Sequence, residues 1–396
     1  MADSQKIAGT LEKYGLQNTE DERSADVLIF NTCSVRQKAE DRVFGLNKKF
    51  RELKARRKKM KIVLAGCMLH YSQDELERRL PGIDIILKNT DTKKLPRLLG
   101  LKNYGHRMSI VKPAYTNSES ALVPITYGCN NFCSYCIVPF SRGREISRPV
   151  KDIINEVKSA VKRGQKEVWL LGQNVNSYKS EGTNFPKLLR LVNAIPGDFW
   201  IRFTSPHPKD FSEEMIKAMA ECKKFPHYIN LPAQAGNNDI LKKMNRPYTV
   251  DHYKNIIKKI RAAMPDIAIS TDIIVGFPGE TRKQFLDTAR LMSEVKFDMA
   301  YLSEYSPRSK TLAAEKYKDN VPHAEKEKRK NELNEILKKT SLEFNKKLVG
   351  QIVTVLNGRT EHNKPIRLDK GYPKNTFVKA EVTQANVWSF KGKAIE

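Results

Sequence analysis

The stretch from residue 121 to about residue 345 alternates short apolar runs with amphipathic helical segments. Strands are expected at 122–126, 167–171, 200–204, 227–231, 267–275 and 299–305. Helices are expected near 150–163 and 186–194, and further amphipathic stretches separate most of the later strands. Six successive strand–helix units favour a full or partial parallel barrel, whose working face lies at the carboxyl ends of its strands.

Four expected loops on that face carry polar or turn-forming residues. They are Gly172-Gln173-Asn174 and the segments 205–208, 232–236 and 276–280. Glycine, proline and asparagine also end strands for steric reasons, so a single loop of this kind would carry little weight. Four of them on one face favour a binding site there.

Three of the six cysteines fall in the segment GCNNFCSYC, where Cys129, Cys133 and Cys136 have the spacing C-x3-C-x2-C. In a long chain of intracellular character thiols stay reduced, so we expect no disulfide framework. Three thiolates on one tight loop favour a metal or cluster site. A closed zinc site needs a fourth ligand, which no nearby His or Cys supplies. A 4Fe-4S cluster held by three thiolates leaves one iron open, so we predict the cluster and keep zinc as the alternative.

The first 100 residues or so have the pattern of an open parallel α/β domain. Strands are expected at 25–33, 61–67 and 82–87, with a crossover helix over 36–60 and another helix near 73–80. The first two strands end at Cys33 and Cys67. The carboxyl ends of parallel strands meet at one edge of a sheet, so these thiols can converge on a ligand. The alternative is that both are small buried side chains of the core.

The C-terminal part changes character. A long helix is expected over 325–344, and the residues after 349 form short apolar runs broken by glycine, which is typical of a small β-barrel. Between Lys346 and Glu396 there are ten Lys or Arg and four Asp or Glu. Such a module is commonly a binder of single-stranded nucleic acid, although a solvated basic face is the alternative. We therefore expect an α/β domain at 1–102, a linker at 103–114, a barrel at 115–345 and the β module at 346–396.

Charge is the main compositional signal. The 396 residues have a formal net charge of +26, and 40% of them are hydrophobic. The hydrophobic content excludes wholesale disorder, and the charge predicts a polyanionic partner such as nucleic acid. No apolar run approaches the roughly 18 residues of a membrane span, and the first residues lack the features of a signal peptide. We expect a soluble cytoplasmic protein.

The segment TYGCNNFCSYCIVPFSRGREISRP resembles the radical S-adenosylmethionine (SAM) methylthiotransferases. The resemblance covers nearly the whole chain, through NTCSVR, AGCM, LLGQNVNSY, RFTSPHPKDF, LPAQAGN, MNRPYT, TDIIVGFPGET and EYSPRS in order. The stretches LLGQNVNSY and FTSPHPKDF are similar to the branch that modifies isopentenylated adenosine in tRNA. The C-terminal module resembles the TRAM domain, which presents RNA in this family.

This resemblance implies a cofactor set and a site. Cys129, Cys133 and Cys136 would hold a 4Fe-4S cluster that binds SAM at its open iron, and Cys33 and Cys67 would be two of three ligands of an auxiliary 4Fe-4S cluster. The residues that would line the SAM site are Gly172, Gln173, Ser205, Gln234 and Gly276. We expect no catalytic side chain beyond the cluster ligands, and we take Cys222 as a structural thiol. Arg142, Arg144 and Arg148 could meet phosphates or carboxylates, or be solvated.

The implied partners are a tRNA anticodon arm and an electron donor protein, with no membrane and no DNA. Other substrates remain open: threonylcarbamoyladenosine, a ribosomal-protein aspartate, or none, for an RNA-binding iron–sulfur protein that inserts no sulfur.

Two departures from the family pattern matter. The chain starts at Met1, just past the place where family members have a first strand that ends in a cysteine. Either the true start lies upstream or sulfur insertion has been lost, and we favour the first because Cys33 and Cys67 keep their motifs. The stretch 355–360 is also shorter than the family pattern by most of a hairpin.

Overall fold

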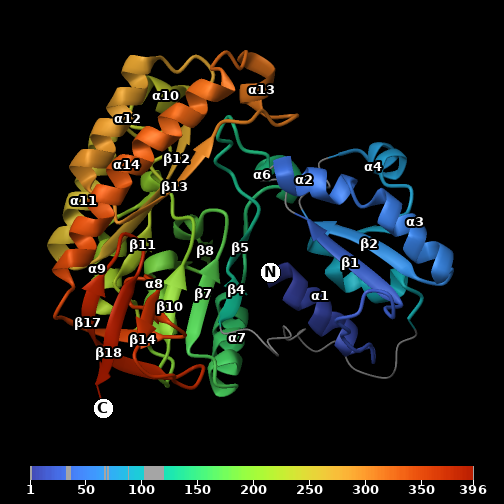
Figure 1. Ribbon diagram of the computed structural model, residues 1–396. Coiled ribbons are helices and arrows are strands. Elements are labelled where there is room, and N and C mark those ends of the chain that lie inside the picture. Colours follow the sequence, from blue (N-terminus) through green and yellow to red (C-terminus); the bar gives the residue numbers. More distant parts are fainter. Residues whose placement is uncertain are drawn as a thin grey trace. The chain divides into compact units, whose positions relative to one another are not determined.

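The computed structural model describes residues 2–32, 37–66, 68, 71–87, 89–101 and 120–395. Its contacts divide the chain into two compact units (Figure 1). The first contains residues 1–117, 128–130 and 136–144, and the second contains residues 118–127, 131–135 and 145–396. Cys33, Cys67 and the expected linker lie outside the described residues.

The first unit is built on a three-stranded parallel sheet in the order β1-β2-β3. Its strands are β1 (Val27–Thr32), β2 (Lys61–Gly66) and β3 (Ile85–Leu87). Alternate residues of β2 enter different cores: Ile62 and Leu64 pack with Phe50, whereas Val63 and Ala65 pack with Ile7. Both faces of the sheet are therefore covered, as the continuous apolar runs predicted.

In the described part of the first unit, five α-helices and one 3-10 helix surround this sheet. They are α1 (Ala2–Glu12), α2 (Gln37–Phe44), α3 (Asn47–Arg56), α4 (Gln73–Arg79), η2 (Asn89–Lys94) and α5 (Leu95–Leu98). The single crossover helix expected over 36–60 is wrong, because the chain breaks at Gly45 and Leu46 between α2 and α3. Glycine has the poorest helix propensity after proline, which accounts for a break at this place.

The second unit has the expected partial barrel of six parallel strands. One sheet has the order β10-β7-β4, from Trp200–Phe203, Glu167–Leu171 and Ala121–Pro124, and the other has the order β11-β12-β13, from Tyr228–Asn230, Ala268–Val275 and Met299–Glu304. The helices that follow the strands present apolar stripes to them. In α8, for example, Phe185, Leu188, Leu189 and Val192 are buried at helical spacing.

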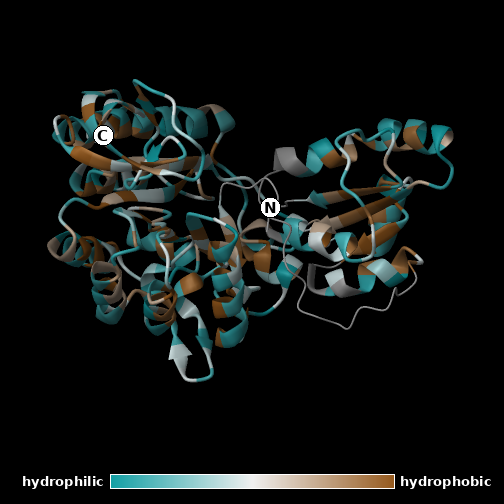
Figure 2. Ribbon diagram, turned by 90° about the horizontal axis from the view of Figure 1, so that it is seen from below, coloured by the Kyte–Doolittle hydropathy of each residue, from teal (hydrophilic) through white to brown (hydrophobic). Residues whose placement is uncertain are grey.

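The helices of the barrel are α7 (Val150–Lys162), α8 (Phe185–Asn193), α9 (Glu213–Glu221), α10 (Asn238–Lys243), α11 (Val250–Ala263), α12 (Arg282–Val295) and α14 (His323–Lys347). Short elements complete its loops: β5 (Thr126–Tyr127), β6 (Ile146–Ser147), β8 (Lys179–Ser180), β9 (Thr183–Asn184), α13 (Leu312–Lys316), η3 (Val175–Ser177) and η4 (Pro208–Asp210). The short helix α6 (Val138–Arg142) is grouped with the first unit. In Figure 2 the strands are mostly hydrophobic and the helices carry mixed faces.

The C-terminal module is a curled five-stranded sheet in the order β15-β14-β17-β18-β16. Its strands are β14 (Ile352–Leu356), β15 (Arg359–Thr360), β16 (Ile366–Leu368), β17 (Phe377–Ala385) and β18 (Phe390–Ile395). Asn357 and Gly358 join β14 to β15 in a two-residue turn with φ of 49° and 74°. Such turns favour Asn-Gly, and this one is as short as the sequence indicated.

The module packs against the barrel within the second unit. Lys364 forms a buried ion pair with Asp298, the residue just before β13, at 3.3 Å. Arg202 of β10 is also buried, and its Nε donates to Glu167 Oε1 at 2.7 Å while its terminal nitrogens face the Thr360 and Glu361 carbonyls. These contacts fix the β module to the base of the barrel.

None of the helices in the described part of the chain is both long enough and apolar enough to cross a membrane.

Candidate radical SAM site

The cysteine loop begins at a glycine that no other residue could replace without strain. Gly128 has φ of 71°, and a Cβ atom there would lie 2.1 Å from the Arg144 carbonyl oxygen. The next residue, Cys129, donates its backbone N–H to the Gly143 carbonyl at 3.1 Å. The start of the loop is therefore held against the chain that follows α6, and only glycine permits this close approach.

Among the described residues, the cysteines of this loop and Cys222 form no disulfide. Among the described residues, no three His, Cys, Asp or Glu side chains are grouped so that they could hold one metal ion. A zinc ion needs its ligands around a single point, whereas each thiolate of a 4Fe-4S cluster binds a different iron.

The residues expected to line the SAM site follow the carboxyl ends of neighbouring strands. Gly172 follows β7 and Ser205 follows the adjacent β10. Gln234 forms a bridge with Ile273 of β12, and Gly276 follows β12 directly. Gln173 shares the loop of Gly172 and is half-buried. The carboxyl edge of each sheet thus carries part of the predicted set.

Close packing and backbone conformation single out several of these positions. A Cβ atom on Gly172 would lie 2.2 Å from Thr126 Oγ1. Ser205 and Gln234 adopt left-handed conformations, with φ of 57° and 68°. Non-glycine residues adopt this region at a cost, and they do so preferentially at functional sites.

The loop that begins at Gly276 is held by buried charges. Gly276 N donates to Glu280 Oε2 at 2.7 Å, and Arg329 of α14 donates to the same oxygen at 2.8 Å. A Cβ atom on Gly276 would lie 2.3 Å from Lys326 Cγ. Gly276 is therefore required for packing against α14, whatever it contacts in a ligand.

The loops after β7 and β10, whose sequences are the branch-specific stretches, bind each other. Asn176 accepts from His207 N at 2.7 Å and donates to His207 O at 3.0 Å, and Asn174 donates to Asp210 at 2.7 Å. His207 is buried, and burial, with Arg246 and Lys209 nearby, lowers its pKa to about 2. The imidazole is therefore neutral, and it is a fixed part of the contact between the two loops.

Sequence reasoning missed Arg246. The motif MNRPYT contains it, but nothing in the motif shows that the guanidinium is buried and that its Nη1 lies 3.5 Å from Cys133 Sγ. A burial of this kind depends on segments more than a hundred residues apart in the sequence, and only the structure reveals it.

Ion pairs are formed by Arg148 and Arg142, which follow the cysteine loop. Arg148 pairs with Glu156 at 2.6 Å, and both side chains are largely buried. Arg142 pairs with Asp3 at 3.3 Å. Cys222 lies at the end of α9, where burial raises the pKa of its thiol to about 11, in keeping with a structural role.

Comparison with known proteins decides the family. Residues 123–292 match the radical SAM superfamily, and residues 1–88 match a family described as uncharacterized protein family UPF0004. Over 425 aligned residues the chain is 43% identical to the tRNA-2-methylthio-N(6)-dimethylallyladenosine synthase of Thermoanaerobacter sp. (strain X514), covering 100% of this chain and 90% of that protein. The chain belongs to this family of radical SAM transferases. The synthase of Clostridium novyi (strain NT) is 41% identical, over 99% of this chain and 93% of that protein.

Solved structures support the fold of the radical SAM enzyme. The methyltransferase TsrM from Kitasatospora setae has a TM-score of 0.59 at 15% identity, over 79% of this chain and 73% of that chain. The cobalamin-dependent SAM radical enzyme OxsB has a TM-score of 0.56 at 10% identity, over 86% of this chain and 54% of that chain. The expected α/β class with a radical SAM barrel is thereby confirmed.

The family implies a 4Fe-4S cluster and SAM, and the described residues fit both. The cysteine loop offers three thiols that are not in disulfides among the described residues. At the carboxyl edge of the β10-β7-β4 sheet, three buried polar atoms of the described residues have no hydrogen-bond partner: Thr126 Oγ1, Asn174 Oδ1 and His207 Nε2. Buried polar atoms without partners are rare in native structures and mark places where a ligand or water completes the site.

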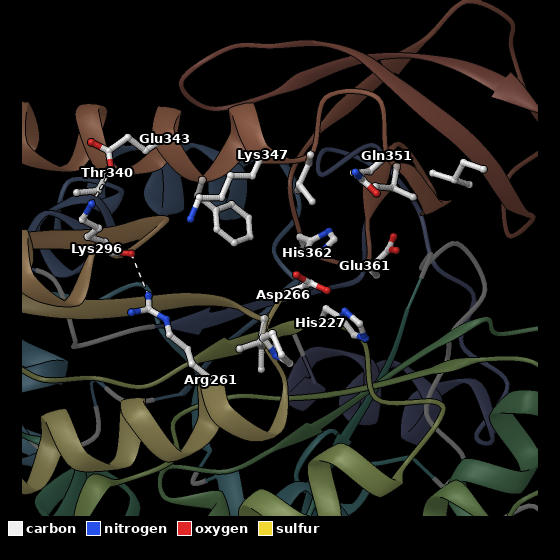
Figure 3. Close-up of a pocket in the computed structure, with 16 residues that line it drawn as sticks. His227, Arg261, Asp266, Lys296, Thr340, Glu343, Lys347, Gln351, Glu361 and His362 are labelled. Atoms are coloured by element: carbon white, nitrogen blue, oxygen red, sulfur yellow. Dashed lines mark hydrogen bonds and ion pairs between the residues drawn. The ribbon is translucent and has the colours of Figure 1, made fainter.

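A separate cavity of about 560 Å³ lies at the opposite end of the second sheet (Figure 3). It is bordered by the residues that precede β11 and β12, by the last turns of α14 and by the β module. Lys296 pairs there with Glu343 at 3.0 Å, and Arg261 donates to the Lys296 carbonyl at 3.1 Å. Because the amino ends of barrel strands usually serve stability, this cavity is not the catalytic chamber.

Proposed function

We propose that this enzyme attaches a methylthio group to C2 of N6-isopentenyladenosine beside the anticodon of tRNA. The observation that carries the proposal is the identity of about 40% over the whole chain with synthases named for this product. The branch-specific loops support it, because Asn176 of one loop and the buried His207 of the other are joined by two hydrogen bonds.

In this proposal Cys129, Cys133 and Cys136 hold the 4Fe-4S cluster, and the loops at Gly172, Gln173, Ser205, Gln234 and Gly276 hold SAM. When bound, the two groups supply the one-electron chemistry that breaks a carbon–sulfur bond of the sulfonium. The chain itself binds and orients the reactants and excludes water. Cys33 and Cys67 would contribute to a second cluster, and an electron donor protein would reduce the site.

The β module supplies a surface for the RNA. Its strand register places Arg367, Lys379, Lys391 and Lys393 on one outer face, and all four are exposed. The inner face is the apolar core around Val378 and Val382. A basic face of this kind suits the phosphates of a single-stranded loop in the cytoplasm, and its affinity for RNA should fall as salt rises.

The test is nucleoside mass spectrometry of tRNA from cells with and without the gene. Deletion should abolish 2-methylthio-N6-isopentenyladenosine and leave N6-isopentenyladenosine in its place. The intact gene and a Cys222→Ala variant should restore the product, whereas Cys133→Ala should not, because Cys133 is one of the three proposed cluster ligands and Cys222 is not. An unchanged peak after deletion would refute the proposal, and loss of a methylthiolated threonylcarbamoyladenosine instead would reassign the substrate.

A further inference from the structure

The middle of the cysteine loop is held by the segment that ends α10. Ser134 donates its backbone N–H to the Met244 carbonyl at 3.0 Å and its hydroxyl to the Lys243 carbonyl at 2.7 Å. Asn245 donates its side-chain amide to the Phe132 carbonyl at 2.9 Å. Phe132 has φ of 46°, a left-handed conformation that costs free energy unless its surroundings enforce it. Cys133 is thus fixed on both sides by the MNRPYT segment.

The next residue of that segment, Arg246, reaches the cysteine itself. Its guanidinium donates to three acceptors: Nη1 to Cys133 Sγ at 3.5 Å, Nε to Tyr248 Oη at 3.0 Å and Nη2 to the Pro232 carbonyl at 3.3 Å. Tyr248 in turn donates its hydroxyl to the Ala233 carbonyl at 2.9 Å. The planar fork is therefore held from three directions, which a lysine ammonium could not reproduce.

Arg246 also places a permanent positive charge beside one sulfur. The side chain is 7% exposed, and a guanidinium does not lose its proton in proteins. Among the residues that the structure describes, no carboxylate is recorded in an ion pair with it, although the charges of Arg246 and Asp272 interact through space. Its charge is therefore not cancelled by a paired anion.

We propose that Arg246 is a positioning residue that presets the Cys133 sulfur and makes the proposed 4Fe-4S cluster easier to reduce. This inference rests on the proposed function, since it needs a cluster on Cys133. An added electron makes a cluster more negative, and hydrogen bonds and positive charge at a ligating sulfur stabilise that state. The segment MNRPYT therefore acts on the cluster through Cys133, although it lies more than a hundred residues from the cysteine loop.

The experiment is an anaerobic redox titration of the reconstituted full chain, followed by electron paramagnetic resonance, with iron per chain measured in parallel. Arg246→Gln should shift the midpoint to more negative potential by an amount that corresponds to at least a tenfold weaker reduction equilibrium, about 59 mV for one electron. Arg246→Lys, which keeps the charge, should lie between Arg246→Gln and wild type. Lys242→Gln, which removes an exposed charge from the nearby helix α10, should not move the potential.

A potential in Arg246→Gln equal to that of wild type would overturn the inference. If this variant holds no iron, Tyr248→Phe is titrated instead, because it keeps the charge of Arg246 and removes one of the three hydrogen bonds that position its guanidinium. A negative shift in Tyr248→Phe supports the inference, and an unchanged potential overturns it. Failure of the proposed function gives a different result: wild-type protein would then bind no cluster or would make no 5′-deoxyadenosine from SAM.

Discussion

Gly172 shows what a single missing side chain contributes to the site. It follows β7 directly, and its backbone passes so close to Thr126 that a methyl group would lie 2.2 Å from the hydroxyl oxygen. The next nearest atom, Val175 Cγ1, would lie at 3.2 Å. Thr126 Oγ1 is itself buried without a partner, so an intrusion here would disturb one of the atoms expected to face a ligand.

Gly172→Ala is therefore expected to lower the free energy of unfolding by about 1 to 3 kcal/mol, the usual cost of overpacking, and to weaken SAM binding. The double variant with Thr126→Ala should recover most of the stability, because the clashing oxygen is gone. Gly371→Ala is the control, since a Cβ atom at Gly371 meets no neighbour within 4 Å. Denaturation curves with and without SAM measure both effects, and a fully stable Gly172→Ala would contradict the packing account.

The position of a site residue could be predicted from the sequence where a motif lies at the end of a strand. Gly172, Ser205 and Gly276 follow strands that the sequence shows as apolar runs, so their edge of the sheet could be predicted. Arg246 and His207 could not be identified as buried, because burial of a polar residue depends on which distant segments pack around it. Their motifs were visible, but their environments were not.

The elements of the barrel were the most predictable, because each strand and each amphipathic helix satisfies a local pattern. The crossover helix was wrong for a local reason, the glycine at position 45. Docking of the β module against the barrel is a property of elements that no local pattern contains. It depends on Lys364, Arg202 and Asp298, which are charged and which sequence reasoning would place on the surface.

His362, in the short connection between β15 and β16, tests this docking through its pH dependence. It is 4% exposed, and burial, with His227, Arg202 and Lys364 nearby, lowers its pKa from 6.5 to about 3. Below pH 6.5 the unfolded chain takes up a proton that the folded chain refuses. The free energy of unfolding should therefore decrease as the pH is lowered, by about 2 kcal/mol from this group between pH 7 and pH 5.

In denaturant titrations at the two pH values, His362→Gln should show a loss of stability that is smaller than that of wild type by about this amount. The comparison uses the difference between pH values, so a uniformly less stable variant remains informative. If His362→Gln and wild type have the same pH dependence, the imidazole is not buried against the barrel.

At the scale of the whole molecule, the net charge of +26 is explained by where the charges lie. In the first unit, residues 48–61 contain nine Lys or Arg and one Glu, and most of these lie on α3 and the turn after it. In the second unit, the outer face of the β module is basic while its inner face is apolar. The composition predicted a polyanion, and the family indicates an RNA.

The central claim is that this chain methylthiolates isopentenylated tRNA. The most direct measurement incubates anaerobically reconstituted protein with SAM, sulfide, a reductant and tRNA that carries either N6-isopentenyladenosine or threonylcarbamoyladenosine, and then analyses the nucleosides by mass spectrometry. The claim predicts the gain of one methylthio group on the isopentenylated nucleoside alone, and none with Cys133→Ala. Protein that holds its cluster and binds tRNA but adds no methylthio group to either nucleoside would contradict it.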